Sequence, residues 1–211
     1  MDNDALFALV AVERRRAADM FEGLDRQQLA SPSLCSAWSA RDMAGHLALP
    51  FAVSLPMVML GMVRHRGSFD SYSAKASREI GSQPVSRLVT TLRDNAESRW
   101  TPPGKGAIAP LTDLCVHVRD VARPLDLDVC APRETWREIL TSLFSGQARS
   151  GTIPRHRAEG LEVHATDLGE TWGNGARLEG PTEALVMALA GRTVAVGDLA
   201  GDGTAVLRAR L

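Results

Sequence analysis

The chain has 211 residues, of which 45% are hydrophobic, and a formal net charge of −1. A chain of this length and apolar content can bury the core of one domain with an appendage, or of two small domains. The near-neutral charge and the lack of a basic stripe in the sequence argue against a nucleic-acid partner, because binding to a phosphate backbone requires clustered positive charge.

The cysteines and the N-terminal sequence bear on the compartment in which the protein is expected. Cys35, Cys115 and Cys130 are odd in number and have no C-x-x-C spacing, so neither a disulfide framework nor a thiolate zinc knuckle is expected. The first residues contain no basic segment of the kind that begins a signal peptide. We therefore expect a cytoplasmic protein.

Up to about residue 148 the apolar spacing predicts helices and no strand. The expected helices are Asp4–Leu24, Ser39–Val63, Pro84–Trp100, Ala107–Arg123 and Pro132–Phe144, with one further short turn at Asp25–Leu29. The polar stretch Gly67–Gln83 is expected to be an irregular or short helical crossover. An antiparallel helix bundle with this longer crossover is the economical arrangement.

The composition changes after Gly151. Leu161–Thr166 alternates apolar and polar residues, which is typical of a half-buried strand, and G-N-G-A-R-L-E-G indicates a turn and a second short strand. Pro181–Ala190 predicts a helix, and Thr204–Leu211 fits a helix or a strand. The fold class is therefore mainly α, with a helical bundle at 1–148 and a short α/β appendage at 151–211 that packs on the bundle.

The helix predicted at Ser39–Val63 has a clear start. Ser39 is an N-cap candidate with Asp42 three residues later, and Trp38 precedes the cap as a hydrophobic staple would. From Leu47 to Val63 every face is apolar, which indicates a buried helix or, alternatively, a membrane span. Such a span would be at the short limit and would contain two prolines, so we expect no membrane partner.

His46 stands at the threshold of this apolar run. Pro50 has no N–H to donate to the carbonyl of His46, so a polar side chain and a freed carbonyl meet at one level of the helix. A buried imidazole needs a partner for each ring nitrogen. His46 is therefore either a hydrogen-bonded core residue or part of a site.

The candidate partners of His46 lie on the helix predicted at Ala107–Arg123. Asp113 and His117 are spaced i, i+4, so both project from one face, and Asp120 adds to the same stripe. With His46 they form a set of two histidines and one carboxylate that can hold a divalent cation and leave positions for water or substrate. The spacing does not place the two helices face to face, and the alternative is an Asp–His pair on a solvated face.

Other candidate residues have simpler interpretations. Cys35 precedes a helix N-terminus, where it is either a thiol with a lowered pKa or a small residue that anchors the loop. Cys115 is expected in the core, His65 and His156 lie between arginines and are expected at the surface, and His164 either faces solvent or lines a pocket. The sequence contains no G-x-S-x-G elbow, P-loop or G-x-G-x-x-G motif after a strand.

Three motifs in order carry a family resemblance: S-P-S-L-C-S-A-W-S-A-R-D-M-A-G-H-L-A, D-L-C-V-H-V-R-D-V-A-R-P-L and L-E-G-P-T-E-A-L-V-M-A-L-A-G-R. Together they resemble the mycothiol-dependent maleylpyruvate isomerase family of the DinB-like superfamily. The resemblance implies a DinB-like four-helix bundle in which His46, Asp113 and His117 hold a divalent metal, with zinc as the first expectation and nickel or another ion as alternatives. Asp113 stands where the isomerase has the longer Glu, and the C-terminal part resembles a shortened form of the family's sterol-carrier-like appendage.

The resemblance also implies a function. It predicts a metal-dependent enzyme that uses mycothiol as a thiol cosubstrate for S-transfer to, or isomerisation of, a small electrophile. Asp42 and Asp120 would either orient a ligating imidazole or lie at the surface. Two alternatives remain open: a hydrolase that uses a metal-activated water, and a non-catalytic helical module that binds a metal or small ligand.

Overall fold

The computed structural model describes residues 1–35, 38–65, 67–145 and 153–211, and the chain divides into two compact units. Helices α1 (Asn3–Gly23) and α7 (Ile108–Ala122) contribute residues to both units. The predicted domain boundary at 148–151 lies outside the described residues, so the division into 1–148 and 151–211 stays a prediction. The helical unit consists of Val10–Trp100 and His117–Cys130, and the sheet unit consists of Met1–Leu9, Thr101–Val116 and Ala131–Leu211.

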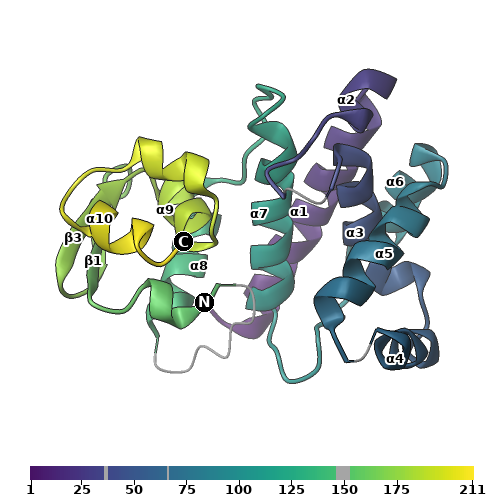
Figure 1. Cartoon of the computed structure of the whole chain (residues 1–211), viewed down its shortest axis with the longest axis horizontal. Helices are drawn as coiled ribbons and strands as arrows, with labels where there is room; N and C mark the ends of the chain where they lie inside the picture. The colour runs from purple at the N-terminus through teal and green to yellow at the C-terminus, as the bar shows by residue number, and fades with distance from the viewer. Residues whose placement is uncertain (36–37, 66, 146–152) are drawn as a thin grey trace. The chain divides into compact units, whose positions relative to one another are not determined.

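The helical unit confirms most of the predicted helices. Gly67–Gln83, for which an irregular or short helical crossover was the expectation, contains the thirteen-residue helix α5, which packs along α3 (Figure 1). The last predicted helix of this unit is shorter than expected, because α6 ends at Asp94. Besides α1, the helices are α2 (Arg26–Ala30), α3 (Ala40–Ala52), α4 (Leu55–Arg64), α5 (Phe69–Gly81) and α6 (Val85–Asp94).

Helix α3 begins as the sequence predicts. Ser39 is its N-cap, and its side chain accepts a hydrogen bond from the backbone N–H of Asp42 while the Asp42 carboxylate accepts one from the backbone N–H of Ser39. This reciprocal capping box satisfies two N–H groups that the first turn of a helix leaves without helical partners. It fixes the start of the helix that carries His46.

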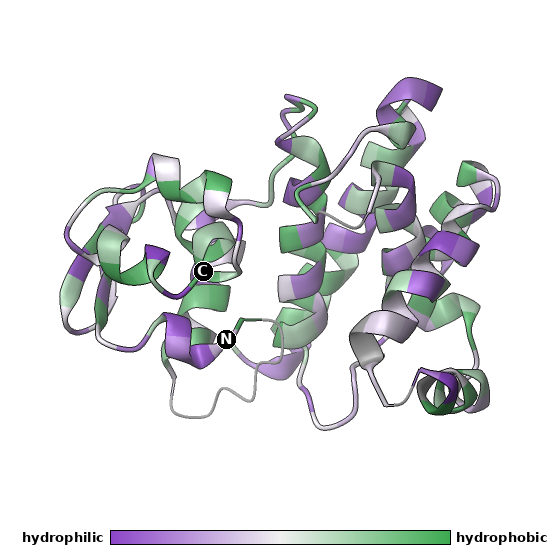
Figure 2. Cartoon of the chain, in the orientation of Figure 1, coloured by the Kyte–Doolittle hydropathy of each residue, from purple (hydrophilic) through white to green (hydrophobic). Residues whose placement is uncertain are grey.

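The prediction of one buried helix over Ser39–Val63 is wrong beyond Ala52. The helix ends at Ala52, the following Val53 is extended, and α4 begins after Ser54 with Pro56 in its first turn. Proline is favoured at a helix start and disfavoured in a helix interior, which explains the break. Four large apolar residues of α4 are 49–75% exposed: Met57, Met59, Leu60 and Val63. Figure 2 colours much of this helix as hydrophobic.

The membrane-span alternative is not supported by the helices. In the described part of the chain, no helix combines the length and the apolar character that a membrane crossing needs.

A buried arginine fastens the segment that follows α6. The guanidinium of Arg14, which is 2% exposed, donates hydrogen bonds to the carbonyls of Asn95, Ala96 and Ser98 at 3.1, 2.9 and 2.5 Å. It also lies 5.0 Å from the ring centroid of Phe51. Burial lowers the pKa of Arg14 to about 10, so the side chain remains charged at neutral pH. These bonds give charged donors to three carbonyls in the segment that follows α6.

Glu13 gives the stability of this protein a specific pH dependence. Its carboxylate is 1% exposed and accepts a hydrogen bond from Arg16 at 2.8 Å, but burial raises its pKa more than Arg16 lowers it. Because the folded state then holds the proton more tightly than the unfolded state, the stability contributed by Glu13 is lost as the pH rises above 4.5. We expect the stability of Glu13→Gln relative to wild type to increase from about pH 4 to about pH 7 in urea unfolding. Parallel pH curves for the two proteins would contradict this.

The sheet unit contains a small mixed sheet with strand order β2-β1-β3. Strand β1 (Leu161–Ala165) is the strand predicted by alternation, and Leu161, Val163 and Ala165 are buried. It pairs antiparallel with β2 (Glu170–Gly173), which the sequence analysis did not predict, and parallel with β3 (Ala176–Gly180). The helices of this unit that follow α7 are α8 (Arg133–Phe144), η1 (Arg155–Arg157), α9 (Thr182–Leu189), η2 (Thr193–Asp198) and α10 (Gly203–Arg208).

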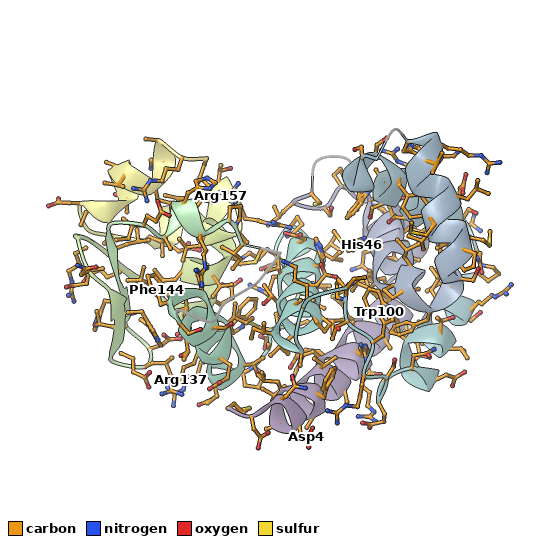
Figure 3. All side chains as sticks on the ribbon, turned by 90° about the horizontal axis from the view of Figure 1, so that it is seen from below. Asp4, His46, Trp100, Arg137, Phe144 and Arg157 are labelled. Carbon is orange, nitrogen blue, oxygen red and sulfur yellow. The ribbon has the colours of Figure 1, made fainter. Side chains whose placement is uncertain are left out.

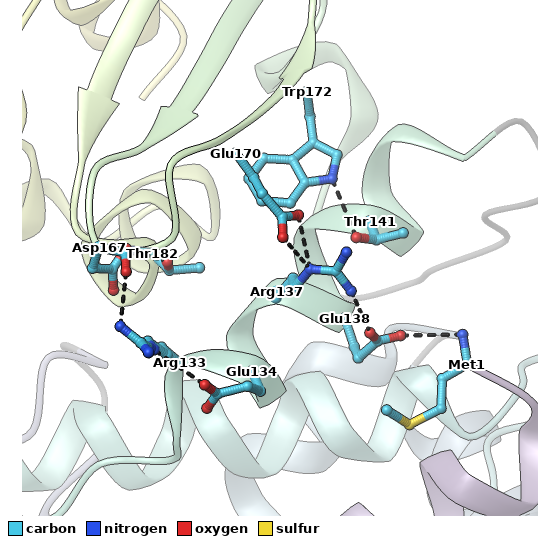
Figure 4. Close-up of polar contacts among 10 residues, drawn as sticks. All are labelled: Met1, Arg133, Glu134, Arg137, Glu138, Thr141, Asp167, Glu170, Trp172 and Thr182. Atoms are coloured by element: carbon cyan, nitrogen blue, oxygen red, sulfur yellow. Dashed lines mark hydrogen bonds and ion pairs between the residues drawn. The ribbon is translucent and has the colours of Figure 1, made fainter.

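Polar contacts join α8 to the sheet (Figure 4). The Nε of Arg137 donates to both carboxylate oxygens of Glu170 at 2.8 and 2.7 Å, and the indole of Trp172 donates to Thr141 at 3.2 Å. Arg133 donates to the carbonyl of Asp167 at 2.9 Å. Because such partly exposed ion pairs contribute little individually, these contacts set orientation more than stability. The buried side of α9 supplies the apolar packing of this unit.

Candidate metal centre

The rings of His46 and His117 meet inside the helical unit. Their centroids are 4.8 Å apart and their planes are nearly perpendicular, at 83°. His46 comes from α3, and Figure 3 shows it among the side chains of this unit; His117 comes from α7. Asp113 lies one turn before His117 on the same continuous helix, and ligand atoms of His46, Asp113 and His117 lie within 4.8 Å of one another. That these three side chains hold an ion stays a prediction.

A buried carboxylate orients His117. The Nδ1 of His117 is 2.8 Å from the Oδ2 of Asp120, and the side chain of Asp120 is 0% exposed. Of the two positions that the sequence left open for Asp120, the surface position is therefore wrong. An acceptor at Nδ1 assigns the ring proton to that nitrogen and gives Nε2 the role of ligand atom, as in carboxylate–histidine–metal arrangements.

The side chains that contact the Nδ1 of His46 are serines, and not Asp42, which the sequence analysis offered for the role of orienting this ring. The hydroxyls of Ser73 and Ser77 are each 3.4 Å from the Nδ1 of His46, and both serines are buried. The Asp42 carboxylate accepts from the N–H and the hydroxyl of Ser39, at 3.0 and 2.8 Å, and so caps α3. The i, i+4 spacing of Ser73 and Ser77 would have placed both hydroxyls on one face, but only if this stretch had been assigned as a helix.

Two glycines bring these serines to the histidine. A Cβ at Gly45 would lie 2.2 Å from the carbonyl oxygen of Ser77 and 2.5 Å from the backbone nitrogen of Gly81. A Cβ at Gly81 would lie 2.9 Å from the carbonyl oxygen of Arg41. Helices α3 and α5 therefore approach with backbone against backbone, because neither contact leaves room for a side chain.

Trp38 borders the two histidines. Its ring centroid is 4.6 Å from that of His46 and 6.1 Å from that of His117. Its Nε1 is buried and has no hydrogen-bond partner among the described residues. An indole N–H in this position can donate a hydrogen bond to a ligand beside the two imidazoles.

Cys35 also belongs to this neighbourhood. Its Sγ and ligand atoms of His117 and Asp120 lie within 4.8 Å of one another. The sequence left Cys35 as either a thiol with a lowered pKa or a small residue that anchors the loop, and only its place before the cap of α3 indicated a functional role. Residues 36 and 37, which belong to the first family motif, lie outside the described residues.

The remaining candidates lie in other environments. His65 contacts the hydroxyl of Ser71 at 2.8 Å, His164 contacts that of Thr171 at 2.9 Å, and His156 is exposed. Cys115 is 1% exposed, which confirms its predicted place in the core. The described cluster is therefore built from α3, α5, α7 and the loop before α3.

The helical fold and a cluster of two imidazoles and a carboxylate define a class of protein: a helical scaffold with donors suited to a divalent metal. Two solved structures share the fold: the crystal structure of the mycothiol-dependent maleylpyruvate isomerase, with a TM-score of 0.50 at 16% identity, and that of a histidine-to-alanine mutant of the isomerase, with 0.54 at 13%. Each match covers 96% of this chain and 93% of the other. No family model and no curated protein matches the sequence.

These matches confirm the resemblance at the level of the fold. They support the predicted fold class, which is mainly α with a small α/β part in the C-terminal region. At such low identity a shared fold does not transfer an activity. The chemistry has to be argued from the side chains of this chain.

Asp120 gives a test of how the imidazole is held. We expect Asp120→Asn to weaken zinc binding by about 10- to 100-fold, the range found when a carboxylate behind a ligating histidine is changed. The asparagine still accepts from Nδ1 but carries no charge. Competition with a chelating dye measures the affinity. The matched control is Asp42→Asn, which should leave zinc affinity unchanged because that carboxylate caps α3; equal losses in both variants would contradict this assignment.

Proposed function

We propose that the protein is a divalent-metal-dependent enzyme that uses a low-molecular-weight thiol, mycothiol, for S-transfer to or isomerisation of a small electrophile. His46, Asp113 and His117 would hold the ion, and zinc is the first candidate. The observation that carries the proposal is the convergence of their ligand atoms within 4.8 Å. The fold similarity to mycothiol-dependent maleylpyruvate isomerase supports the choice of thiol.

The donor set fits a catalytic ion. Three protein ligands of the two-histidine, one-carboxylate type leave coordination positions for a cosubstrate, whereas closed structural zinc sites use four protein ligands. The hydrogen bonds of Asp120 to His117, and of Ser73 and Ser77 to His46, restrict both rings in the manner of an outer ligand shell. A metal held by these residues would lower the pKa of a coordinated thiol and so supply a thiolate nucleophile at neutral pH.

The protein residues around the ion would set substrate geometry. The buried Nε1–H of Trp38 is placed to donate to a polar atom of the thiol or of the electrophile. Met43 and Leu47 are buried on the same helix as His46 and would restrict the access of water to its side chain. A thiol bound beside Trp38 would therefore have one hydrogen-bond donor and restricted access to water.

The proposal is tested by incubating zinc-loaded protein with a panel of small electrophiles, with and without mycothiol. We expect turnover only when both zinc and mycothiol are present. Turnover of an ester or amide in the absence of mycothiol would favour the metal-dependent hydrolase instead. A purified wild type that binds no divalent metal at equilibrium would reject the proposed enzyme and favour a non-catalytic module.

A further inference from the structure

Backbone hydrogen bonds hold Cys35 against α7. The N–H of Leu34 donates to the carbonyl of Asp120 at 2.9 Å. The N–H of Cys35 donates to the hydroxyl of Ser33 at 3.2 Å, and its carbonyl accepts from the N–H of Trp38 at 2.8 Å. The same loop is thus tied both to the helix that carries His117 and to the residue that borders His46. These hydrogen bonds fix the backbone position of Cys35 beside α7.

Cys35 shares His117 with the proposed metal site. Its Sγ lies within 4.8 Å of ligand atoms of His117 and Asp120, and His117 is also within 4.8 Å of the ligand atoms of His46 and Asp113. A zinc ion binds thiolate sulfur at about 2.3 Å and imidazole nitrogen at about 2.0–2.1 Å, so two such donors of one ion are at most about 4.4 Å apart. For Cys35 to be a donor of the same ion, its side chain would have to turn so that the sulfur comes within this range of the other donor atoms.

We propose that Cys35 is a thiolate ligand that occupies the cosubstrate's position on the metal when the low-molecular-weight thiol is absent. This proposal rests on the proposed function. With Cys35 the donor set becomes two nitrogens, one oxygen and one sulfur, which favours zinc or cobalt over magnesium or calcium. Four protein ligands close the site to water, and displacement of Cys35 opens it.

The exchange that opens the site balances without a redox partner. The bond between the metal and the sulfur of Cys35 breaks, a bond between the metal and the sulfur of the incoming thiol forms, and the proton of the incoming thiol passes to Cys35. One thiolate is bound before and after, so the charge at the site does not change. Cys35 thereby keeps the site occupied by a sulfur ligand until the cosubstrate arrives.

Cobalt(II) reports directly on sulfur ligation, because thiolate coordination produces a charge-transfer absorption in the near ultraviolet. The test compares cobalt-loaded wild type, Cys35→Ser and the matched control Cys130→Ser, without added thiol and at equal cobalt content. We expect the absorption in wild type and Cys130→Ser and its loss in Cys35→Ser. On titration with mycothiol, the absorption should return in Cys35→Ser, whereas it should stay nearly constant in wild type, where one thiolate ligand replaces another. Far-ultraviolet circular dichroism confirms folding, and Cys35→Ala serves as the second variant.

The outcomes separate this proposal from the proposed function. Cobalt bound to wild type without the charge-transfer absorption overturns the role of Cys35 and leaves the metal site in place. Absorption that persists in both Cys35 variants also overturns it, because another sulfur must then be the ligand. Failure of all proteins to bind cobalt rejects the proposed metal site itself.

Discussion

Replacing His117 with alanine is expected to weaken zinc binding by at least about 100-fold and to abolish thiol-dependent turnover. Loss of an outer hydrogen-bond partner alone costs 10- to 100-fold in affinity, and this change removes a ligand as well. His117 is common to both donor clusters of the described residues, so neither cluster keeps three members without it. Metal content after dialysis, followed by competition with a chelating dye, measures the effect.

The His117→Ala variant is compared with a second ligand variant and with a control. Alanine leaves the buried carboxylate of Asp120 without the imidazole 2.8 Å away, which also destabilises the fold. Asp113→Ala avoids this cost because Asp113 is only half-buried, and it should lose metal while remaining folded. The control is His156→Ala at an exposed histidine, which should keep full metal content. Stoichiometric zinc in His117→Ala and Asp113→Ala would refute the assigned ligands.

The metal candidates were accessible from the sequence because each has a local signature. Asp113 and His117 are one turn apart on a helix that is stopped by Pro124, and His46 follows a capping box that the structure confirms. Such signals depend on residues within a few positions of one another, which a sequence displays directly. The same holds for β1, whose alternation is read over five residues.

The environment of the candidates depends on distant residues. Ser73 and Ser77 contact His46 across 27 and 31 positions, and Cys35 reaches His117 from a loop with no helical pattern of its own. A contact that forms only through tertiary packing produces no periodic pattern in the sequence. The break after Ala52 was missed for a related reason: apolar composition suggested continuity, although Pro56 favours a new helix start.

Gly45→Ala is expected to be the most disruptive single methyl group in the helical unit. Its Cβ would lie 2.2 Å from the carbonyl oxygen of Ser77 and 2.5 Å from the nitrogen of Gly81, and both are backbone atoms that cannot rotate away. Overpacking of this kind costs about 3 kcal/mol, which corresponds to a fall of roughly 6–12 °C in the unfolding midpoint of a chain of this size. Thermal unfolding followed by circular dichroism measures it.

The same substitution should reach the metal site, because α3 can accommodate the methyl group only by moving away from α5. The hydroxyls of Ser73 and Ser77 would then leave the Nδ1 of His46, and zinc affinity should fall even in the protein that remains folded. Gly23→Ala is the matched control, since a Cβ at Gly23 meets no atom within 4 Å, and it should change neither stability nor affinity appreciably. If Gly45→Ala matched this control in both measurements, the backbone contact between α3 and α5 would not be what positions His46.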